Sequence, residues 1–83
     1  MKSIGIDWAV EEFCNMYGIK SNRQKQVLQL VMDGFNDKEI GEFLGLSDKT
    51  IAYHFCNVIK KTNFGDRKNV QAEIYKIALE GNR

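Results

Sequence analysis

The chain has few residues that could bind a metal ion or attack a substrate. Its cysteines and its histidine are Cys14, Cys56 and His54. A structural zinc site needs four ligands in closely spaced pairs, so three such residues argue against one. His54 and Cys56 form a nominal base–nucleophile pair, but residues two positions apart on a helix point in different directions and would not hydrogen-bond. We therefore expect no enzymatic activity, no metal ion and no cofactor, and we expect the thiols to stay reduced in a cytoplasm.

The charged side chains suit a different chemistry, the binding of a polyanion, but the net charge of the whole chain supports it only weakly. Lys plus Arg number 12 and Asp plus Glu number 11, which gives a net charge of +1 in 83 residues. This balance argues against a protein that grips nucleic acid by overall charge alone. The charges are unevenly placed, however, because residues 20–63 hold seven basic and five acidic residues, whereas residues 1–19 hold one basic and three acidic residues. The middle of the chain therefore carries a modest basic surplus.

Apolar residues recur at spacings of three and four, which predicts amphipathic helices. The expected helices span residues 7–17, 22–33, 37–44, 48–62 and 67–80. No segment alternates with period two, so we expect an all-α fold, a small helical bundle forming a single domain over residues 1–83. No run of consecutive apolar residues exceeds three, whereas a membrane span needs about 20, so we exclude a membrane span.

Capping residues mark the ends of these helices. Residues that favour a helix N-terminus precede each segment, namely Asp7, Ser21, Asn36, Ser47 and Asp66. Glycines that favour a C-terminal cap follow four of the five segments, namely Gly18, Gly34, Gly45 and Gly81. Asn36 and Glu39 also have the spacing of a capping box.

A short helix, a tight turn and a longer helix meet at Gly45-Leu46-Ser47, which is the outline of a helix-turn-helix. Leu46 is expected to fill the hydrophobic centre of the turn, and Ser47 to cap the second helix. Gly41 costs about 1 kcal/mol relative to Ala inside a helix, so a small residue there indicates a close approach by the neighbouring segment. This pattern alone leaves DNA binding and a helical interaction module equally open.

Three stretches add a resemblance to a known family. Residues 21–28 look like Thr-x-Arg-Glu-x-Glu-Val-Leu, residues 34–40 like Gly-x-Ser-Asn-Lys-Glu-Ile, and residues 44–51 like Leu-x-Ile-Ser-x-x-Thr-Val. These are motifs of the LuxR/GerE-type DNA-binding domain of bacterial transcription regulators, which the chain resembles over residues 21–78. The resemblance implies a helix-turn-helix domain over residues 21–80, preceded by one extra helix. It also implies that helix 48–62 enters the major groove.

The same resemblance implies which side chains meet DNA. Base contacts are expected from the outward face of helix 48–62, at Lys49, Ala52, Tyr53, Cys56 and Asn57. The family often has base-reading lysines where this chain has Ala52 and Cys56. Asn57 can pair with adenine, and Tyr53 and Ala52 can pack on a thymine methyl group, which allows either a reader of A·T-rich sites or a helix that reads little. Tyr53 suits a protein contact equally well.

Phosphate contacts are expected around this helix and at its flanks. The candidates are Lys38, Ser47, Thr50, His54, Lys60, Lys61 and Arg67. His54 has a second interpretation, as a partly buried residue that packs near Ile51 and Val58. The resemblance further implies dimer formation through the last helix, with Val70, Ile74, Tyr75 and Ile77 as the contact residues.

We therefore expect a stand-alone cytoplasmic transcription regulator that binds double-stranded DNA as a homodimer. The chain begins with Met and encodes no sensor domain, so regulation would come from its abundance or from a partner. The alternative is a protein-binding helix-turn-helix module that antagonises or assists another transcription regulator, or contacts RNA polymerase, without reading DNA. The apolar helix 7–17, with Trp8 and Phe13, either packs on the domain or forms a surface for a dimer or another regulator.

Overall fold

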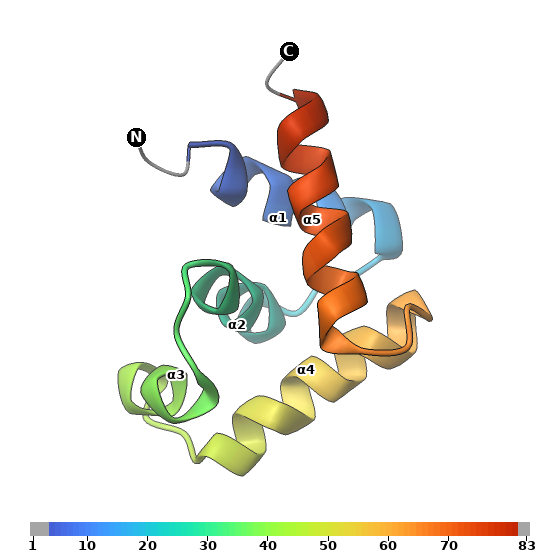
Figure 1. Cartoon of the computed structure of the whole chain (residues 1–83). Coiled ribbons are helices and arrows are strands. Elements are labelled where there is room, and N and C mark those ends of the chain that lie inside the picture. The colour runs from blue at the N-terminus through green and yellow to red at the C-terminus, as the bar shows by residue number, and fades with distance from the viewer. Residues whose placement is uncertain (1–3, 82–83) are drawn as a thin grey trace.

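Residues 4–81, which the computed structural model describes, form five helices joined by short turns (Figure 1). Their bounds are α1 Ile4–Tyr17, α2 Asn22–Met32, α3 Asp37–Leu44, α4 Asp48–Thr62 and α5 Arg67–Gly81. No strand occurs among these residues, so the all-α prediction is confirmed, and α3 and α4 begin and end where the sequence predicts. Within the same part of the chain, no helix is both long and apolar enough to cross a membrane.

Local hydrogen bonds fix the beginnings of α2, α3 and α4. The Ser21 hydroxyl, the Asn36 carboxamide oxygen and the Ser47 hydroxyl each accept a hydrogen bond from the backbone N–H three residues later, at 3.3, 2.9 and 3.1 Å. The Glu39 carboxylate accepts from the Asn36 N–H at 2.9 Å and completes the predicted capping box. Asp66 accepts in the same way at the start of α5, at 3.0 Å. These side chains satisfy amides that have no partner within their helix.

Three helix ends differ from the prediction, and one of them is the end of α2, which lies at Met32 rather than at residue 33. The first helix begins at Ile4, so Asp7 lies inside its first turn, where a carboxylate interacts favourably with the helix dipole. Gly81 is still helical and is not one of the glycines with positive φ. A Cβ atom at this position would collide with the Trp8 ring. Gly81 therefore permits close packing of α5 against α1, rather than turning the chain.

The core draws large, fully buried side chains from every helix. These residues include Phe13 of α1, Leu28 of α2, Ile40 of α3, Phe55 of α4 and Ile74 of α5. Figure 1 shows α1 crossing behind α5 in the upper part of the molecule, with α4 along the lower edge. Helix α1 thus completes the same core as the other four helices, which confirms that it packs on the rest of the domain.

The dimer contact predicted on α5 needs a correction. Val70 and Ile74 have no exposed surface, and Ile77 is buried as well. A side chain that is enclosed within one copy of the chain cannot contact a second copy, so these three residues serve the core alone. Tyr75 is the predicted contact residue that remains exposed, and Leu79 lies one turn further along the same side of α5.

Candidate nucleic-acid interface

The turn between α3 and α4 is closed by backbone contacts. Gly45 adopts the left-handed conformation at φ 71°, and the Leu46 N–H donates to the Gly41 carbonyl at 2.8 Å. A Cβ atom on Gly41 would collide with the Leu46 carbonyl oxygen. Leu46 itself is half-buried and packs against the core, as the helix-turn-helix outline predicts. Sequence and geometry therefore agree that Gly41 is small because the turn folds back onto α3.

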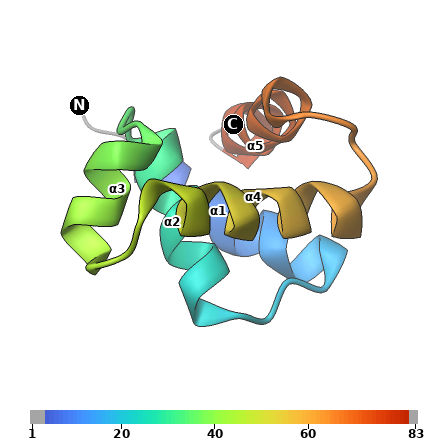
Figure 2. The same cartoon turned by 90° about the horizontal axis from the view of Figure 1, so that it is seen from below.

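This turn presents α4 along one edge of the molecule. Its buried face consists of Ile51, Phe55, Val58 and Thr62, which recur at helical spacing. Seen from below, α4 lies across the front of the molecule, with α1 and α2 behind it (Figure 2). The opposite face of α4 is therefore open along most of its length.

The five predicted base-contact residues lie on or beside that open face. Lys49, Ala52, Tyr53 and Cys56 are exposed, and Asn57 is half-buried. The Tyr53 side chain is 63% exposed, although a tyrosine ring has a large apolar surface to bury. Such exposure is typical of a residue that meets a partner.

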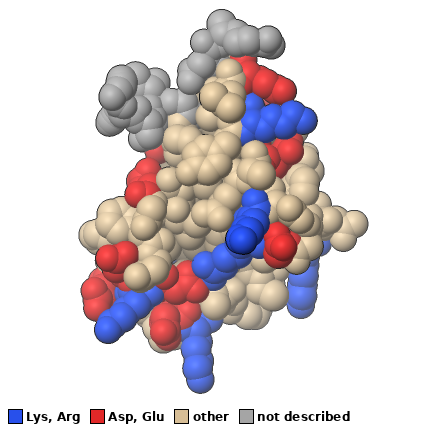
Figure 3. All heavy atoms as spheres, viewed as in Figure 1, with Lys and Arg blue, Asp and Glu red and all other residues tan. Residues whose placement is uncertain are grey.

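The electrostatics of this edge favour an anion. Asp48 in the first turn is the acidic residue of α4, and Lys49, Lys60 and Lys61 are its basic residues. Basic side chains project from the lower edge of the molecule, where α4 lies, and acidic side chains gather at the lower left, over α3 (Figure 3). Lys38, in the first turn of α3, is exposed beside the turn.

Two hydroxyl groups are held together where α4 begins. The Ser47 Oγ accepts from the Thr50 N–H at 3.1 Å, and the two hydroxyl oxygens lie 2.9 Å apart in a hydrogen bond. Ser47 is exposed and Thr50 is half-exposed. Because a hydroxyl both donates and accepts, the pair keeps hydrogen-bonding capacity for a phosphate oxygen.

His54 fits the packing interpretation better than the phosphate interpretation. His54 is half-buried, and it lies in α4 between the core residues Ile51 and Val58. Its Nδ1 atom is buried and has no hydrogen-bond partner among the described residues. The enclosed Nδ1 atom cannot reach a phosphate on the surface, so a phosphate contact by His54 would have to use its Nε2 atom. Because the residue is half-buried, we leave His54 out of the proposed contact set.

Arg67 has a partner that sequence reasoning missed. Its guanidinium donates two hydrogen bonds to the Asp37 carboxylate, at 2.9 and 2.7 Å, and lies 4.6 Å from the centre of the Phe55 ring. Asp37 is 30 positions away, so no local motif indicates the pair. The guanidinium links the starts of α5 and α3 above α4, and we assign it to this clamp rather than to a phosphate.

The two cysteines differ in environment. Cys14 is buried in the core, and burial raises the pKa of its thiol from 9.0 to about 11. Cys56 is exposed on α4. Both thiols are free.

A separate apolar patch lies on α3. The Phe43 side chain is 62% exposed, although the apolar spacing of helix 37–44 predicts it to face the core. Its ring meets that of Phe35 edge-on, with 5.0 Å between the ring centres. The two rings line a shallow pocket of about 310 Å³ together with Glu39 and Glu42.

Comparison with known proteins is consistent with this geometry. The model of the bacterial regulatory protein family named luxR (GerE) matches residues 21–73. The chain is 40% identical over 75 residues to the transcriptional regulatory protein DegU of Brevibacillus brevis, which covers 90% of this chain and 32% of that relative. It is 49% identical over 41 residues to the uncharacterized response regulatory protein YgeK of Escherichia coli, which covers 49% of this chain and 28% of that relative.

A third relative is the transcriptional activator protein AnoR of Acinetobacter nosocomialis, 29% identical over 68 residues, which cover 82% of this chain and 28% of that relative. The chain thus spans about a third or less of the length of these relatives. No solved structure gives a significant match.

Proposed function

The chain belongs to the luxR family of bacterial regulatory proteins, and from this premise we propose that it is a sequence-specific transcription regulator that inserts α4 into the major groove of duplex DNA. The observation that carries the proposal is the open face of α4. After Asp48 this face has basic, aromatic and amide side chains and no carboxylate, and the α3–α4 turn holds it at the edge of the molecule. Such a protein works where the bacterial chromosome lies, so we place it in the cytoplasm.

Base recognition is assigned to the central part of this face. Lys49 can donate to guanine, Asn57 can pair with adenine, and the rings and methyl groups of Tyr53 and Ala52 can pack on a thymine methyl group. Cys56 lies beside them and offers a small, weakly polar surface. Because guanine-reading side chains are few here, we propose that the protein prefers A·T-rich half-sites.

Phosphate recognition is assigned to groups that border this face. Ser47 and Thr50 lie at the N-terminal end of α4, where the helix dipole also favours an anion, and Lys38 of α3 lines the same hollow as Ser47. Lys60 and Lys61 lie at the C-terminal end. Groups at both ends of the helix would fix its register on the duplex, while the bases provide sequence preference.

We further propose a twofold dimer on DNA, with Tyr75 and Leu79 of α5 at the contact. Both side chains are exposed and apolar in large part, whereas the rest of the predicted stripe is in the core. Half-sites should then lie about 34–36 Å apart, one helical turn of DNA. Duplexes with one and two half-sites test this point, since a dimer should bind the two-site duplex more tightly and lose that advantage when the spacing changes by five base pairs.

A protein-binding role is the second candidate, and the Phe35–Phe43 patch favours it. An exposed Phe43 edged by Glu39 and Glu42 suits a partner such as another transcription regulator or RNA polymerase. If this were the sole function, the protein should co-purify with such a partner, and a Phe43→Ser variant should lose the partner. The same protein should then fail to shift any duplex.

Selection of binding sites from random duplexes tests the leading proposal. Wild-type protein should enrich one motif. Tyr53→Ala should reduce the base preference at one position of that motif by roughly 1–3 kcal/mol and leave the preference at the other positions unchanged. Trp8→Ala is the control, because it removes a half-exposed ring from α1, which takes no part in the proposed DNA or dimer contacts, and it should leave the selected motif intact. If wild-type protein enriches no sequence, the proposal is wrong.

A further inference from the structure

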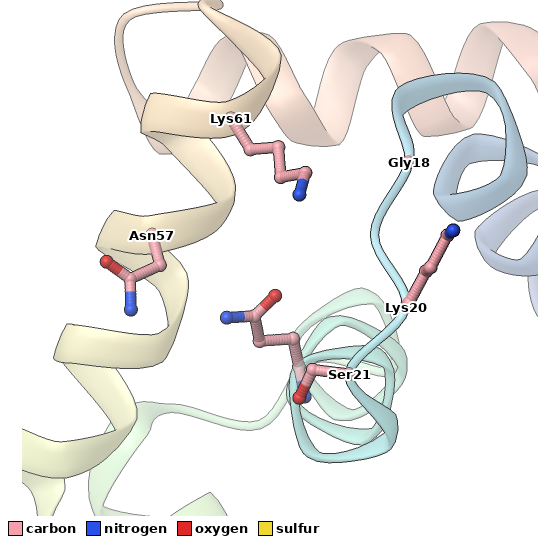
Figure 4. Close-up of a pocket in the computed structure, with 6 residues that line it drawn as sticks. Gly18, Lys20, Ser21, Asn57 and Lys61 are labelled. Atoms are coloured by element: carbon pink, nitrogen blue, oxygen red, sulfur yellow. The ribbon is translucent and has the colours of Figure 1, made fainter.

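A polar pocket lies between α4 and the segment that joins α1 to α2. It has a volume of about 560 Å³ and is lined by Gly18, Lys20, Ser21, Gln24, Asn57 and Lys61. Figure 4 shows Asn57 and Lys61 extending from α4 on one side, and Gly18, Lys20 and Ser21 on the joining segment opposite. None of the sequence motifs brings these two segments together, because more than 30 residues separate Gln24 from Asn57.

The lining of this pocket is suited to an anion. It contains two ammonium groups, two carboxamides and a hydroxyl, and it has no carboxylate. The groove between α1 and α5, in contrast, is lined by Glu12, Glu73 and Glu80, and the hollow at the α3–α4 turn by Glu42 and Asp48. A phosphate group matches a set of cations and neutral donors, and the absence of a nearby carboxylate in the lining removes the main source of repulsion.

The joining segment is held firmly enough to place Lys20. Ile19 before it is 2% exposed, and its N–H donates to the Cys14 carbonyl at 2.9 Å. Ser21 after it caps α2. The backbone of Lys20 is therefore fixed on both sides, while its exposed side chain remains free to turn.

Lys61 reaches toward the same segment from α4. Gly18 has a φ of +72°, and a Cβ atom added there would lie 3.8 Å from Lys61 Cε. The aliphatic part of Lys61 thus lies beside the loop, and its side chain points from α4 toward that side of the pocket (Figure 4). Lys20 lies on the opposite wall, with its side chain directed away from Lys61 in Figure 4, and it would have to turn to reach the same space.

We propose that this pocket holds one phosphate of the DNA backbone, next to the base pairs that α4 reads. Lys20 and Lys61 neutralise the phosphate, and Gln24 and Asn57 donate hydrogen bonds from their carboxamides. The inference rests on the proposed function and extends it, because it makes the segment before α2 part of the interface. Asn57 then lies between base and backbone, which agrees with its half-buried position.

The first test compares charge-neutral variants in DNA titrations at several salt concentrations. Lys20→Gln should weaken binding about threefold to tenfold at 0.1 M salt and reduce the slope of log K against log salt by about 1, as expected for one lost phosphate contact. The loss should be the same for the selected duplex and for a random duplex. Lys76→Gln removes the same charge from the α1–α5 groove and should change affinity by less than about twofold.

The second test locates the phosphate. Single phosphates along the half-site are replaced by uncharged methylphosphonates, one per duplex. One position should weaken binding by wild-type protein but cause no further loss for the Lys20→Gln, Lys61→Gln double variant, because that variant has already lost the contact. Equal losses at that position for both proteins would contradict the proposal, as would a Lys20→Gln variant that binds like the wild type.

These outcomes distinguish a failure of the pocket from a failure of the proposed function. If the wild type binds duplex DNA and Lys20→Gln has no effect, the pocket fails and the proposed function stands. If the wild type binds no duplex even at low salt, the proposed function fails and the pocket fails with it. Lys20 is exposed, so thermal unfolding of Lys20→Gln should match the wild type and exclude misfolding as a cause.

Discussion

At the residue scale, Arg67 joins three helices through one guanidinium. It pairs with both oxygens of Asp37 in α3 and lies over the Phe55 ring of α4, and its own helix α5 begins at this residue. Paired hydrogen bonds to a carboxylate are stronger than single ones, and a guanidinium over a ring adds a cation–π attraction. The clamp therefore fixes the start of α5 relative to the helix-turn-helix.

A double-mutant cycle on Arg67→Gln and Asp37→Asn measures this pair. The side chains are 38% and 25% exposed, so solvent screening reduces the attraction, and the expected coupling is about 1 kcal/mol. The coupling should fall with added salt. The Lys25–Glu11 pair, a single contact of 3.5 Å with side chains 23% and 53% exposed, serves as the control and should give less than about 0.5 kcal/mol. Equal coupling in the two pairs would show that the paired geometry adds nothing.

Thiol chemistry should distinguish the two cysteines. Thiolate is the reactive form, and the raised pKa of about 11 leaves the Cys14 thiol protonated at pH 8, while burial also denies access to reagents. Iodoacetamide should therefore modify Cys56 rapidly and Cys14 only after unfolding, which mass mapping of the modified protein can show. The sign of the pH effect follows from the same shift, since protonated Cys14 favours the folded state below pH 9 and this advantage is lost as the pH rises toward 11. Modification of folded Cys14 at the rate of Cys56 would contradict the buried position.

At the element scale, α3 and α4 are fixed by their turn. Gly41→Ala should gain about 1 kcal/mol of helix propensity but force a Cβ atom against the Leu46 carbonyl, a backbone group that cannot rotate away. We expect net destabilisation of about 1–3 kcal/mol in urea unfolding, as for other overpacked sites. Glu42→Ala, on the exposed side of the same helix, is the control and should stay within about 0.5 kcal/mol of the wild type. A Gly41→Ala variant more stable than the wild type would show that the Leu46 backbone can move away from the added Cβ atom at little cost.

Helix positions could be predicted from sequence where their signals are local. Ser47 and Asn36 act on amides three residues away, so the bounds of α3 and α4 follow from a few neighbouring residues. Gly81 misled the prediction because its role depends on Trp8, at the other end of the chain. Phe43 misled it for a related reason, since helical spacing cannot tell a core position from an exposed apolar one at the edge of a short helix.

In the candidate site, too, the features that depend on one helix could be predicted, and those that depend on the tertiary fold could not. The open face of α4 follows from the period of one helix, so the exposure of Lys49 and Tyr53 was predictable. The Arg67–Asp37 clamp and the pocket beside Lys20 were not, because each joins segments that only the tertiary fold brings together. Tertiary contacts therefore decided which basic residues face the proposed DNA and which hold the fold.

At the scale of the whole molecule, the net charge of +1 conceals a separation of charge. Helix α1, which carries Asp7, Glu11 and Glu12, lies in the upper part of the molecule in Figure 1, and α4 lies at the lower edge. Helix α4 has three basic residues and one acidic residue, and Lys20 adds a further basic residue, whereas α3 has one basic residue and three acidic residues. Long-range steering by overall charge should thus be weak, and binding should depend on local contacts to phosphates.

The central claim, that this protein binds duplex DNA through these contacts, is tested most directly by titrating a selected duplex at salt concentrations from 50 to 300 mM, roughly the range over which phosphate contacts respond strongly. We expect tight binding at low salt and a linear fall of log K with log salt, with a slope of about −0.9 for each phosphate neutralised. No binding at low salt, or an affinity that does not change with salt, would contradict the account.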